Sequence, residues 1–268
     1  MTEQNSAYEQ AIDVKGATVF LGGREILHNI SWQVKQGDRC FILGANGAGK
    51  TTLVKMLMGY AWPLFGAHVS VLGEKFGQTN LIELRKRVAW VSPYMQQMAD
   101  PELKGLELVV SGVDSTFGLF RKMLPEEESK AISILEKLKC VHLKDQQLMT
   151  MSSGEQVKIL IARAMMNNPE LLILDEPSVY LDIAGREFLL ETIAEMAADH
   201  PEITIVFITQ RIEDIMPVFD KGMILKSGNI QSYGMREEVL TEKNLSEAFD
   251  LNIILTPGKN GRLWSMIG

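Results

Sequence analysis

Cysteine is scarce in this sequence, and long hydrophobic runs are missing. The two cysteines, Cys40 and Cys140, lie far apart among 268 residues and show no metal-type spacing, which fits a reduced compartment better than a disulfide framework. No window approaches the roughly 18 apolar residues that a membrane-spanning helix needs. Residues 1–10 are polar and lack the apolar core of a signal peptide. We therefore expect a cytoplasmic protein, peripheral at the inner face of a membrane only where a partner holds it there.

Positive charge is also in deficit. Acidic residues outnumber basic ones 34 to 27, which gives a net charge of -7 and a pI near 5.3. Such a surface repels a polyphosphate backbone, so we expect no nucleic-acid partner. What the sequence does have is 46% hydrophobic residues, enough for the sizeable core of a globular protein.

Strand and helix patterns alternate along the chain. The expected strands, from apolar runs between turn residues, are Ile12–Phe20, Ile30–Val34, Arg39–Leu43, His68–Leu72, Val88–Val91, Leu171–Leu174, Ile203–Thr209 and Met223–Lys226. Three of these segments, RCFILG, LLILDEP and TIVFIT, are continuous apolar runs. Runs of this kind are typical of a parallel sheet covered on both faces, as in α/β folds.

Other parts of the chain depart from this pattern. Alternating residues near the N-terminus, with turns at Gly22–Gly23 and Gln36–Gly37, predict an antiparallel β layer. A segment beginning at Pro125 has apolar residues at helical spacing after an acidic start, which indicates a mostly helical insertion. The tail predicts one more helix, in REEVLTEKNLSEAF, and a hairpin that turns at Pro257–Gly261.

A glycine-rich loop between an apolar strand and an amphipathic segment is the most specific motif. The pattern G-x-x-x-x-G-K-[ST] covers residues 44–51, and its glycines let backbone N–H groups point at a phosphate. Lys50 would reach the β and γ phosphates, and the Thr51 hydroxyl would bind Mg²⁺. The candidate phosphate-binding residues are Gly44, Ala45, Asn46, Gly47, Ala48, Gly49, Lys50, Thr51 and Thr52.

A pair of acidic residues follows the apolar strand Leu171–Leu174. Asp175 would lie at the carboxyl edge of the sheet, where ligands of α/β proteins bind, and it would complete the magnesium shell. Glu176 is placed to orient or deprotonate the water that attacks the γ phosphate.

With these two motifs, the segment MSSGEQVKILIARAMMNNPELLILDEP resembles the ABC-type ATPases, the nucleotide-binding subunits of ATP-binding cassette transporters. The resemblance covers roughly Ile12 to Gly234. It implies a P-loop NTPase (RecA-like) parallel-sheet core with an antiparallel β layer and a helical signature subdomain. We expect one ABC-type domain over residues 1–234, with the helical insertion at about 97–165, and a C-terminal extension over 235–268.

The resemblance also implies a dimer. MSSGEQ is similar to the family signature L-S-G-G-Q, which in the family covers the ATP held by a second cassette packed head to tail. Ser152 and Gly154 would then donate hydrogen bonds to a γ phosphate across the interface, with Glu155 beside them. Ser153 and Glu155 depart from the family's glycine and glutamine. Asp182 matches the family's aspartate that couples the two ATP sites. Independently of the resemblance, Ser152 and Glu155 are expected to form a helix capping box.

Two further family positions are less regular here. The family's Q-loop commonly has Pro-Gln where this chain has Ser92–Pro93, so we expect Gln96 to contact magnesium and the attacking water, with Gln97 as the alternative. The aromatic residue that stacks on adenine would be Phe20; if Leu21 takes that place, about 1 to 3 kcal/mol of stacking is lost.

The strand after Asp175 ends in an unusual residue for the family. Its usual Thr-His pair, whose histidine touches the γ phosphate, reads Thr209–Gln210 here. A glutamine donates and accepts hydrogen bonds but, unlike histidine, it cannot take up a proton and become positively charged near neutral pH. We expect Gln210 to act at the catalytic site with Glu176 and Gln96.

The resemblance implies an ATP-hydrolysing subunit of an ABC transporter that uses ATP and Mg²⁺. It would act as a head-to-tail dimer, as a homodimer in the simplest case, and drive movement of a transmembrane permease. One alternative is a soluble ABC-type ATPase without a permease, although such members commonly carry two cassettes in one chain. A second is a slow nucleotide-dependent switch, which the retained Glu176 argues against and Gln210 favours.

Overall fold

The computed structural model describes residues 8–268, so most of the polar N-terminal stretch lies outside the described residues. The chain divides into two compact units, one formed by the segments up to Arg85 and from Pro201 onward, the other by Lys86–His200. The predicted domain boundaries, at 97, 165 and 234, stay predictions.

The first unit, which contains both described termini, is rich in strands. Its elements are β1 (Gln10–Leu21), β2 (Arg24–Lys35), β3 (Arg39–Leu43), α1 (Lys50–Leu57), β4 (His68–Val71), β5 (Glu74–Lys75), β8 (Thr204–Thr209), β9 (Lys221–Lys226), β10 (Asn229–Met235), α7 (Arg236–Val239), α8 (Glu242–Phe249), β11 (Ile253–Pro257) and β12 (Leu263–Ile267). Helix α2 (Leu81–Arg87) spans the boundary between the units.

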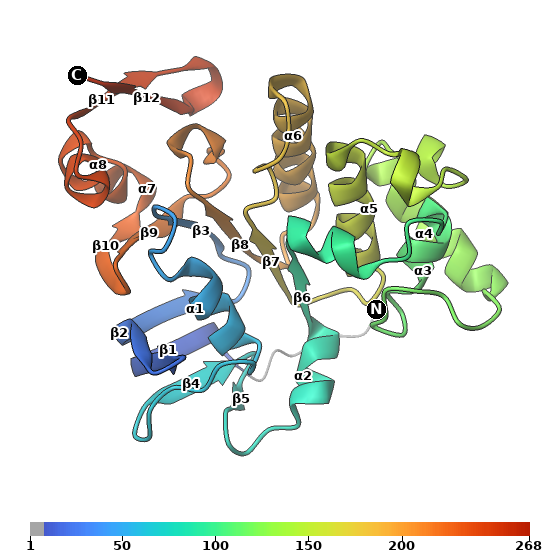
Figure 1. Cartoon of the computed structure of the whole chain (residues 1–268), viewed down its shortest axis with the longest axis horizontal. Coiled ribbons are helices and arrows are strands. Elements are labelled where there is room, and N and C mark those ends of the chain that lie inside the picture. Colours follow the sequence, from blue (N-terminus) through green and yellow to red (C-terminus); the bar gives the residue numbers. More distant parts are fainter. Residues whose placement is uncertain (1–7) are drawn as a thin grey trace. The chain divides into compact units, whose positions relative to one another are not determined.

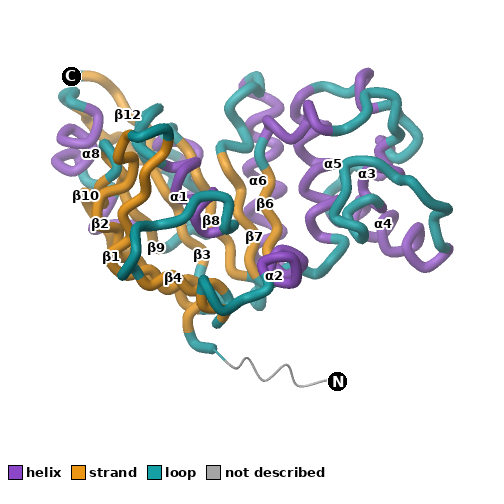
Figure 2. The backbone as a smooth tube through the Cα atoms, turned by 60° about the horizontal axis from the view of Figure 1, so that its bottom comes forward, coloured by secondary structure: helices purple, strands orange, loops and turns teal. Residues whose placement is uncertain are grey.

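The second unit is mostly helical. Its helices and strands are β6 (Val88–Val91), α3 (Gly105–Val110), α4 (Pro125–Lys137), α5 (Ser153–Met165), β7 (Leu171–Asp175) and α6 (Ile183–Asp199), with 3-10 helices at Pro93–Met98, Val141–Leu143 and Leu148–Thr150. Figure 2 shows these helices in purple, with α3, α4 and α5 grouped together.

The antiparallel β layer has the strand order β2-β1-β4-β5. Strands β1 and β2 form a hairpin that turns at Gly22–Gly23, where both glycines have positive φ (58° and 77°). Alternate side chains of β1 are buried, among them Ile12, Val14 and Val19, which is the pattern of a sheet with one face in the core. The predicted antiparallel layer is confirmed.

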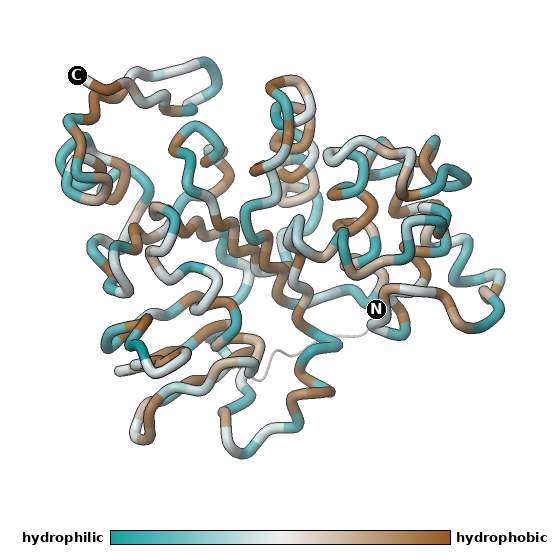
Figure 3. Tube along the Cα trace, in the orientation of Figure 1, coloured by the Kyte–Doolittle hydropathy of each residue, from teal (hydrophilic) through white to brown (hydrophobic). Residues whose placement is uncertain are grey.

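Parallel strands form the sheet core within each unit. In the first, β3 lies parallel to both β8 and β9, so that Phe41 pairs with Phe207 and Gly222. In the second, β6 lies parallel to β7. Every residue of β7 and β8 is buried, and the strands of the sheet carry the brown of hydrophobic residues in Figure 3. The continuous apolar runs therefore predicted the parallel pairing correctly.

The helix predicted after Pro125 is present as α4 (Figure 1), with Ala131 and Leu135 fully buried against α3 and α5. Close packing in this unit depends on Gly112, because a Cβ there would collide with the carbonyl oxygen of Arg163 on α5.

The C-terminal segment differs in two ways from expectation. Strand β10, which pairs antiparallel with β9, has no counterpart among the predicted strands. The single predicted helix is two helices, α7 and α8, because the Thr241 side chain accepts a hydrogen bond from the N–H of Asn244 and so begins a new helix. The predicted hairpin is confirmed: β11 and β12 pair antiparallel on either side of Gly258–Arg262.

Candidate functional site

The glycine-rich loop runs from the end of β3 to the start of α1. Gly47 and Gly49 have φ of 80° and 105°, in the left-handed region that favours glycine. Gly44 is required for a different reason, because a Cβ there would collide with the carbonyl oxygen of Leu225 on β9. The Gly44 N–H donates to the carbonyl of Thr209 at 3.3 Å, so the first residue of the loop is held beside the end of β8.

Lys50 points back into this loop. Its side chain is buried at 5% exposure, and its ammonium donates to the carbonyls of Gly44 (2.8 Å) and Ala45 (3.0 Å). The residues next to it face differently: Thr51 is exposed on the first turn of α1, whereas Thr52 is buried. A concave loop with a cation inside it, at the positive end of a helix, is built to bind phosphate.

The acidic pair lies at the end of β7, within the second unit. Asp175 is the last residue of the strand and only 4% exposed. Glu176 is half-buried and has φ of 52°, a conformation that costs about 1 to 3 kcal/mol for a residue other than glycine. Backbone strain of this kind occurs most often at functional sites, where it holds a side chain in a defined direction. Asp182 caps α6, with its Oδ1 accepting from the Gly185 N–H at 2.7 Å.

The signature segment begins α5 as a capping box. Ser152 is the N-cap, and both its N–H and its hydroxyl donate to Glu155 Oε2 at 2.8 Å. Burial alone would raise the pKa of Glu155, but the Ser152 hydrogen bonds, with His142 and Lys158 nearby, outweigh it and hold that pKa below its ordinary value. The carboxylate is therefore charged at neutral pH. Gly154 follows on the first turn of the helix.

The two candidate Q-loop glutamines are separated by their contacts. The half-buried Gln96 donates from Nε2 to the carbonyl of Ser153, at 3.4 Å, and so joins the 3-10 helix Pro93–Met98 to the signature. Gln97 is exposed. Within this unit the structure places Gln96 beside the signature, and the predicted contact of Gln96 with magnesium and water stays a prediction.

The polar tip of β8 is held by a residue that the sequence did not single out. The hydroxyl of Thr209 donates to Asp214 Oδ2 at 3.4 Å and accepts from the Arg211 N–H at 3.0 Å. Asp214 is completely buried on a 3-10 turn, Ile212–Asp214. A charged residue between Ile212 and Ile215, both buried, is the signal that would have indicated it. Gln210, between these contacts, is half-buried.

The candidate adenine-stacking residues lie at the end of β1. Phe20 and Leu21 are 43% and 39% exposed, so both offer apolar surface there. Exposure does not distinguish Phe20 from Leu21 as the residue that stacks on adenine.

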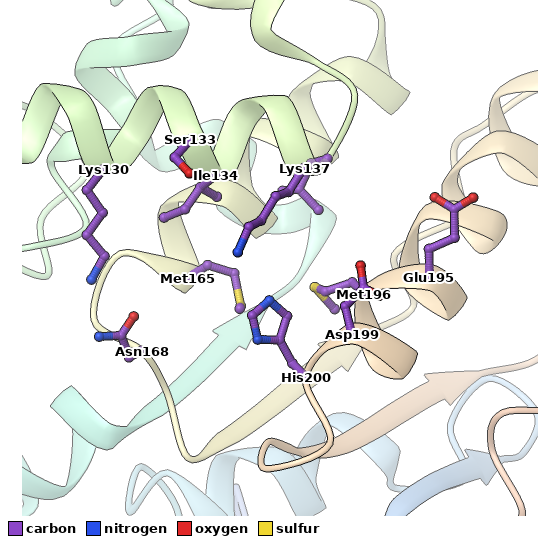
Figure 4. A pocket seen from close by; sticks show the side chains of 11 residues that line it. Lys130, Ser133, Ile134, Lys137, Met165, Asn168, Glu195, Met196, Asp199 and His200 are labelled. Carbon is purple, nitrogen blue, oxygen red and sulfur yellow. The ribbon is translucent and has the colours of Figure 1, made fainter. Parts of the chain in front are cut away.

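A separate cavity of about 230 Å³ lies in the helical unit, between α4, the end of α5 and the end of α6 (Figure 4). Ile134, Met165 and Met196 line it, with Lys137 and His200 among the polar groups. Its walls include none of the candidate site residues, so it is distinct from the phosphate-binding machinery.

Two surveys of residues 8–268 bear on the class of protein. No cluster of three or more His, Cys, Asp or Glu that would hold a metal ion occurs among them. Neither does any helix there combine the length and the apolar character needed to cross a bilayer. The parallel strands and the glycine-rich loop at residues 44–51 define an α/β protein of the P-loop class.

Comparison with known proteins narrows this class. Residues 27–179 match the family model of the ABC transporter. The chain is 41% identical over 232 residues to the uncharacterised ABC transporter ATP-binding protein YlmA of Bacillus subtilis (strain 168), covering 86% of this chain and 88% of that protein. Its fold matches the ADP conformation of MJ1267, an ATP-binding cassette of an ABC transporter (TM-score 0.76, 23% identity, 91% and 98% of the two chains). It also matches the dimeric cassette MJ0796 bound to ADP and Pi (TM-score 0.70, 22% identity, 84% and 98%).

The chain therefore belongs to the ABC transporter family, as one of its ATP-binding proteins. It is an ATPase of the ABC type, and the predicted fold class and family are confirmed.

Proposed function

We propose that this chain binds ATP in the loop 44–51 and hydrolyses it to drive a transporter. The position of Lys50 carries the proposal: a buried ammonium lies inside the loop, on the carbonyls of Gly44 and Ala45 at 2.8 and 3.0 Å. Phosphate oxygens are charged and accept stronger hydrogen bonds than peptide carbonyls. We therefore expect ATP to take over the hydrogen bonds of Lys50, and Phe20 or Leu21 to cover the adenine.

Mg²⁺ fits the same residues. It binds oxygen ligands, few of them from protein, and fills its shell with phosphate and water. Thr51 offers an exposed hydroxyl, Asp175 a nearly buried carboxylate and Gln96 an amide oxygen. Bound there, Mg²⁺ would neutralise charge on the β and γ phosphates.

Three side chains of this chain would act on the attacking water and the γ phosphate. Glu176 would deprotonate or orient the attacking water. Its left-handed backbone conformation fixes the direction in which its side chain leaves the main chain. Gln210 donates a hydrogen bond to the γ phosphate from the tip of β8, and Gln96 holds the water.

The signature implies a second copy. Ser152 and Gly154, exposed or half-buried at the start of α5, would donate to the γ phosphate of a partner cassette in a head-to-tail homodimer. Gln96, the proposed contact of the attacking water, donates to the carbonyl of Ser153 at 3.4 Å. This hydrogen bond would link the water-binding glutamine to the signature segment at the dimer interface. ATP binding would close the dimer and hydrolysis would open it, moving a transmembrane permease at the inner face of a membrane.

The first test is nucleotide binding. Lys50→Ala should abolish binding of a fluorescent ATP analogue, since the loop loses its only buried ammonium donor. Lys55→Ala is the matched control, because Lys55 is exposed on the same helix. Unchanged affinity in Lys50→Ala would contradict the proposal.

The permease is tested by isolation from membranes. An affinity-tagged chain expressed in its own host should bring down one integral membrane protein, at equal stoichiometry, after mild detergent extraction. Recovery of the ATPase only in the soluble fraction, with no membrane protein, would favour an ABC-type ATPase that acts without a permease.

A second candidate function, a slow switch, is favoured by one observation, the amide of Gln210 where the family has histidine. Gln210→His tests it. A clear rise in turnover would favour the switch, whereas an unchanged or lower rate would mean that the site is built around glutamine.

A further inference from the structure

The C-terminal hairpin β11–β12, at the red end of the chain in Figure 1, lies against the segment that follows Gln210. Its turn carries Arg262, which is only 8% exposed. The guanidinium donates from Nε at 3.1 Å and from Nη2 at 2.6 Å, both to the main-chain carbonyl of Glu213. A planar, permanently charged fork on one backbone carbonyl is a directional contact.

The carbonyl that receives this fork belongs to the turn Ile212–Asp214, three residues after Gln210. The same turn is tied to β8 through Asp214 and the hydroxyl of Thr209. Gln210 therefore lies between two fixed points, the tip of β8 before it and the turn held by Arg262 after it.

The hairpin is itself anchored. Arg236, at the start of α7, donates from Nη2 to the carbonyl of Gly261 at 2.7 Å, and the Gly258 N–H donates to the carbonyl of Arg262 at 2.8 Å. The ring of Trp264 lies 5.3 Å from the guanidinium of Arg262, in cation–π range. These contacts hold the hairpin turn that carries Arg262 in place.

A cavity of about 230 Å³ lies between the start of this segment and the tail, lined by Gln210 and Arg211 on one side and by Phe249, Leu251 and Met266 on the other. The turn that follows is packed, since Ile212 is 5% exposed and Asp214 is fully buried. Gln210 and Arg211 therefore border open space, and the turn that Arg262 contacts is the fixed point on their C-terminal side.

We propose that Arg262 is a positioning residue for ATP hydrolysis: it holds the turn after Gln210 so that the Gln210 amide meets the γ phosphate. The C-terminal hairpin then sets the turnover rate without touching nucleotide. This inference rests on the proposed role of Gln210 in the ATP site.

The test is steady-state ATPase kinetics of the full chain. Arg262→Ala should lower kcat about 10-fold, as expected when a reacting group moves by a fraction of an ångström, with KM for ATP within twofold of wild type. Arg262→Lys keeps one charged donor and should recover part of kcat. Lys259→Ala, an exposed position in the same hairpin, is the control and should match wild type.

A double-mutant cycle separates positioning from stability. If Arg262 acts through Gln210, Arg262→Ala should have almost no further effect on kcat in a Gln210→Ala background. An equal loss in both backgrounds, or a lower melting temperature with unchanged kcat, would overturn the proposal. Failure of the proposed role of Gln210 is distinguishable, because Gln210→Ala alone would then leave kcat unchanged.

Discussion

Replacing Glu155 by glutamine should weaken the fold slightly and strengthen ATP-dependent dimerisation. Glu155 completes the capping box of α5, with two hydrogen bonds from Ser152 at 2.8 Å. Glutamine also serves at this position of a capping box, so the hydrogen bonds are largely kept. What is lost is the attraction between a carboxylate and the positive end of the helix, about 0.3 to 1 kcal/mol. The side chain of Glu155 is 32% exposed, so solvent screening favours the lower end.

The size of the stability change depends on pH. The folded-state pKa of Glu155 is lowered, so its charge stabilises the fold above the ordinary pKa of 4.5, and this contribution is lost as pH falls through the folded-state value. Melting temperatures of wild type and Glu155→Gln should differ by about 1 to 3 °C at pH 7. The gap should narrow progressively below pH 4.5.

Dimerisation should change in the opposite direction. In the proposed head-to-tail dimer the signature faces the γ phosphate of the partner's ATP, where a carboxylate repels it. Removing that repulsion is worth roughly 1 kcal/mol, about fivefold in the dimer dissociation constant. Analytical ultracentrifugation with ATP measures it, in a Glu176→Gln background in which we expect turnover to stop. Equal or weaker dimerisation of Glu155→Gln would refute the reasoning, and Glu136→Gln, the same change at an exposed position of α4, is the control.

Three further predictions concern the core and the loop. Burial raises the pKa of Cys40 to about 12 and of Cys140 to about 11, so at pH 8 both thiols should react with a disulfide reagent at least roughly 100-fold more slowly than in the unfolded chain. Leu135→Ala should cost about 2 to 5 kcal/mol of unfolding free energy in urea, whereas Ser133→Ala on the exposed side of α4 should stay within about 0.5 kcal/mol. Gly44→Ala forces a methyl group against the backbone of β9 and should weaken ATP binding more than roughly 10-fold by titration calorimetry, while retained affinity would contradict the required close approach.

The sequence predicted best what local patterns determine. Strands β3 and β6 have the predicted bounds, because an apolar run between turn residues leaves little choice of register or length. The hairpin of β11 and β12 follows from a turn-forming run between alternating residues. The glycine-rich loop was recognisable for the same reason, since its backbone conformation requires glycine at fixed spacing.

Features that depend on distant contacts were missed. Strand β10 is a polar, partly exposed edge strand held by backbone pairing to β9, and its residues show no apolar alternation. The division between α7 and α8 depends on one side-chain cap at Thr241. Arg262 reaches a backbone carbonyl 49 positions away, and a carbonyl has no sequence signature.

The central claim is that this chain hydrolyses ATP with Glu176 acting on water beside the phosphates that Lys50 holds. The most direct measurement is phosphate release by Glu176→Gln with Mg²⁺ and ATP, together with its mass in solution. We predict turnover reduced by about 10²-fold or more, the scale of a lost general base, with an ATP-bound dimer that accumulates. Wild-type turnover in Glu176→Gln, or a monomer at saturating ATP, would contradict the account.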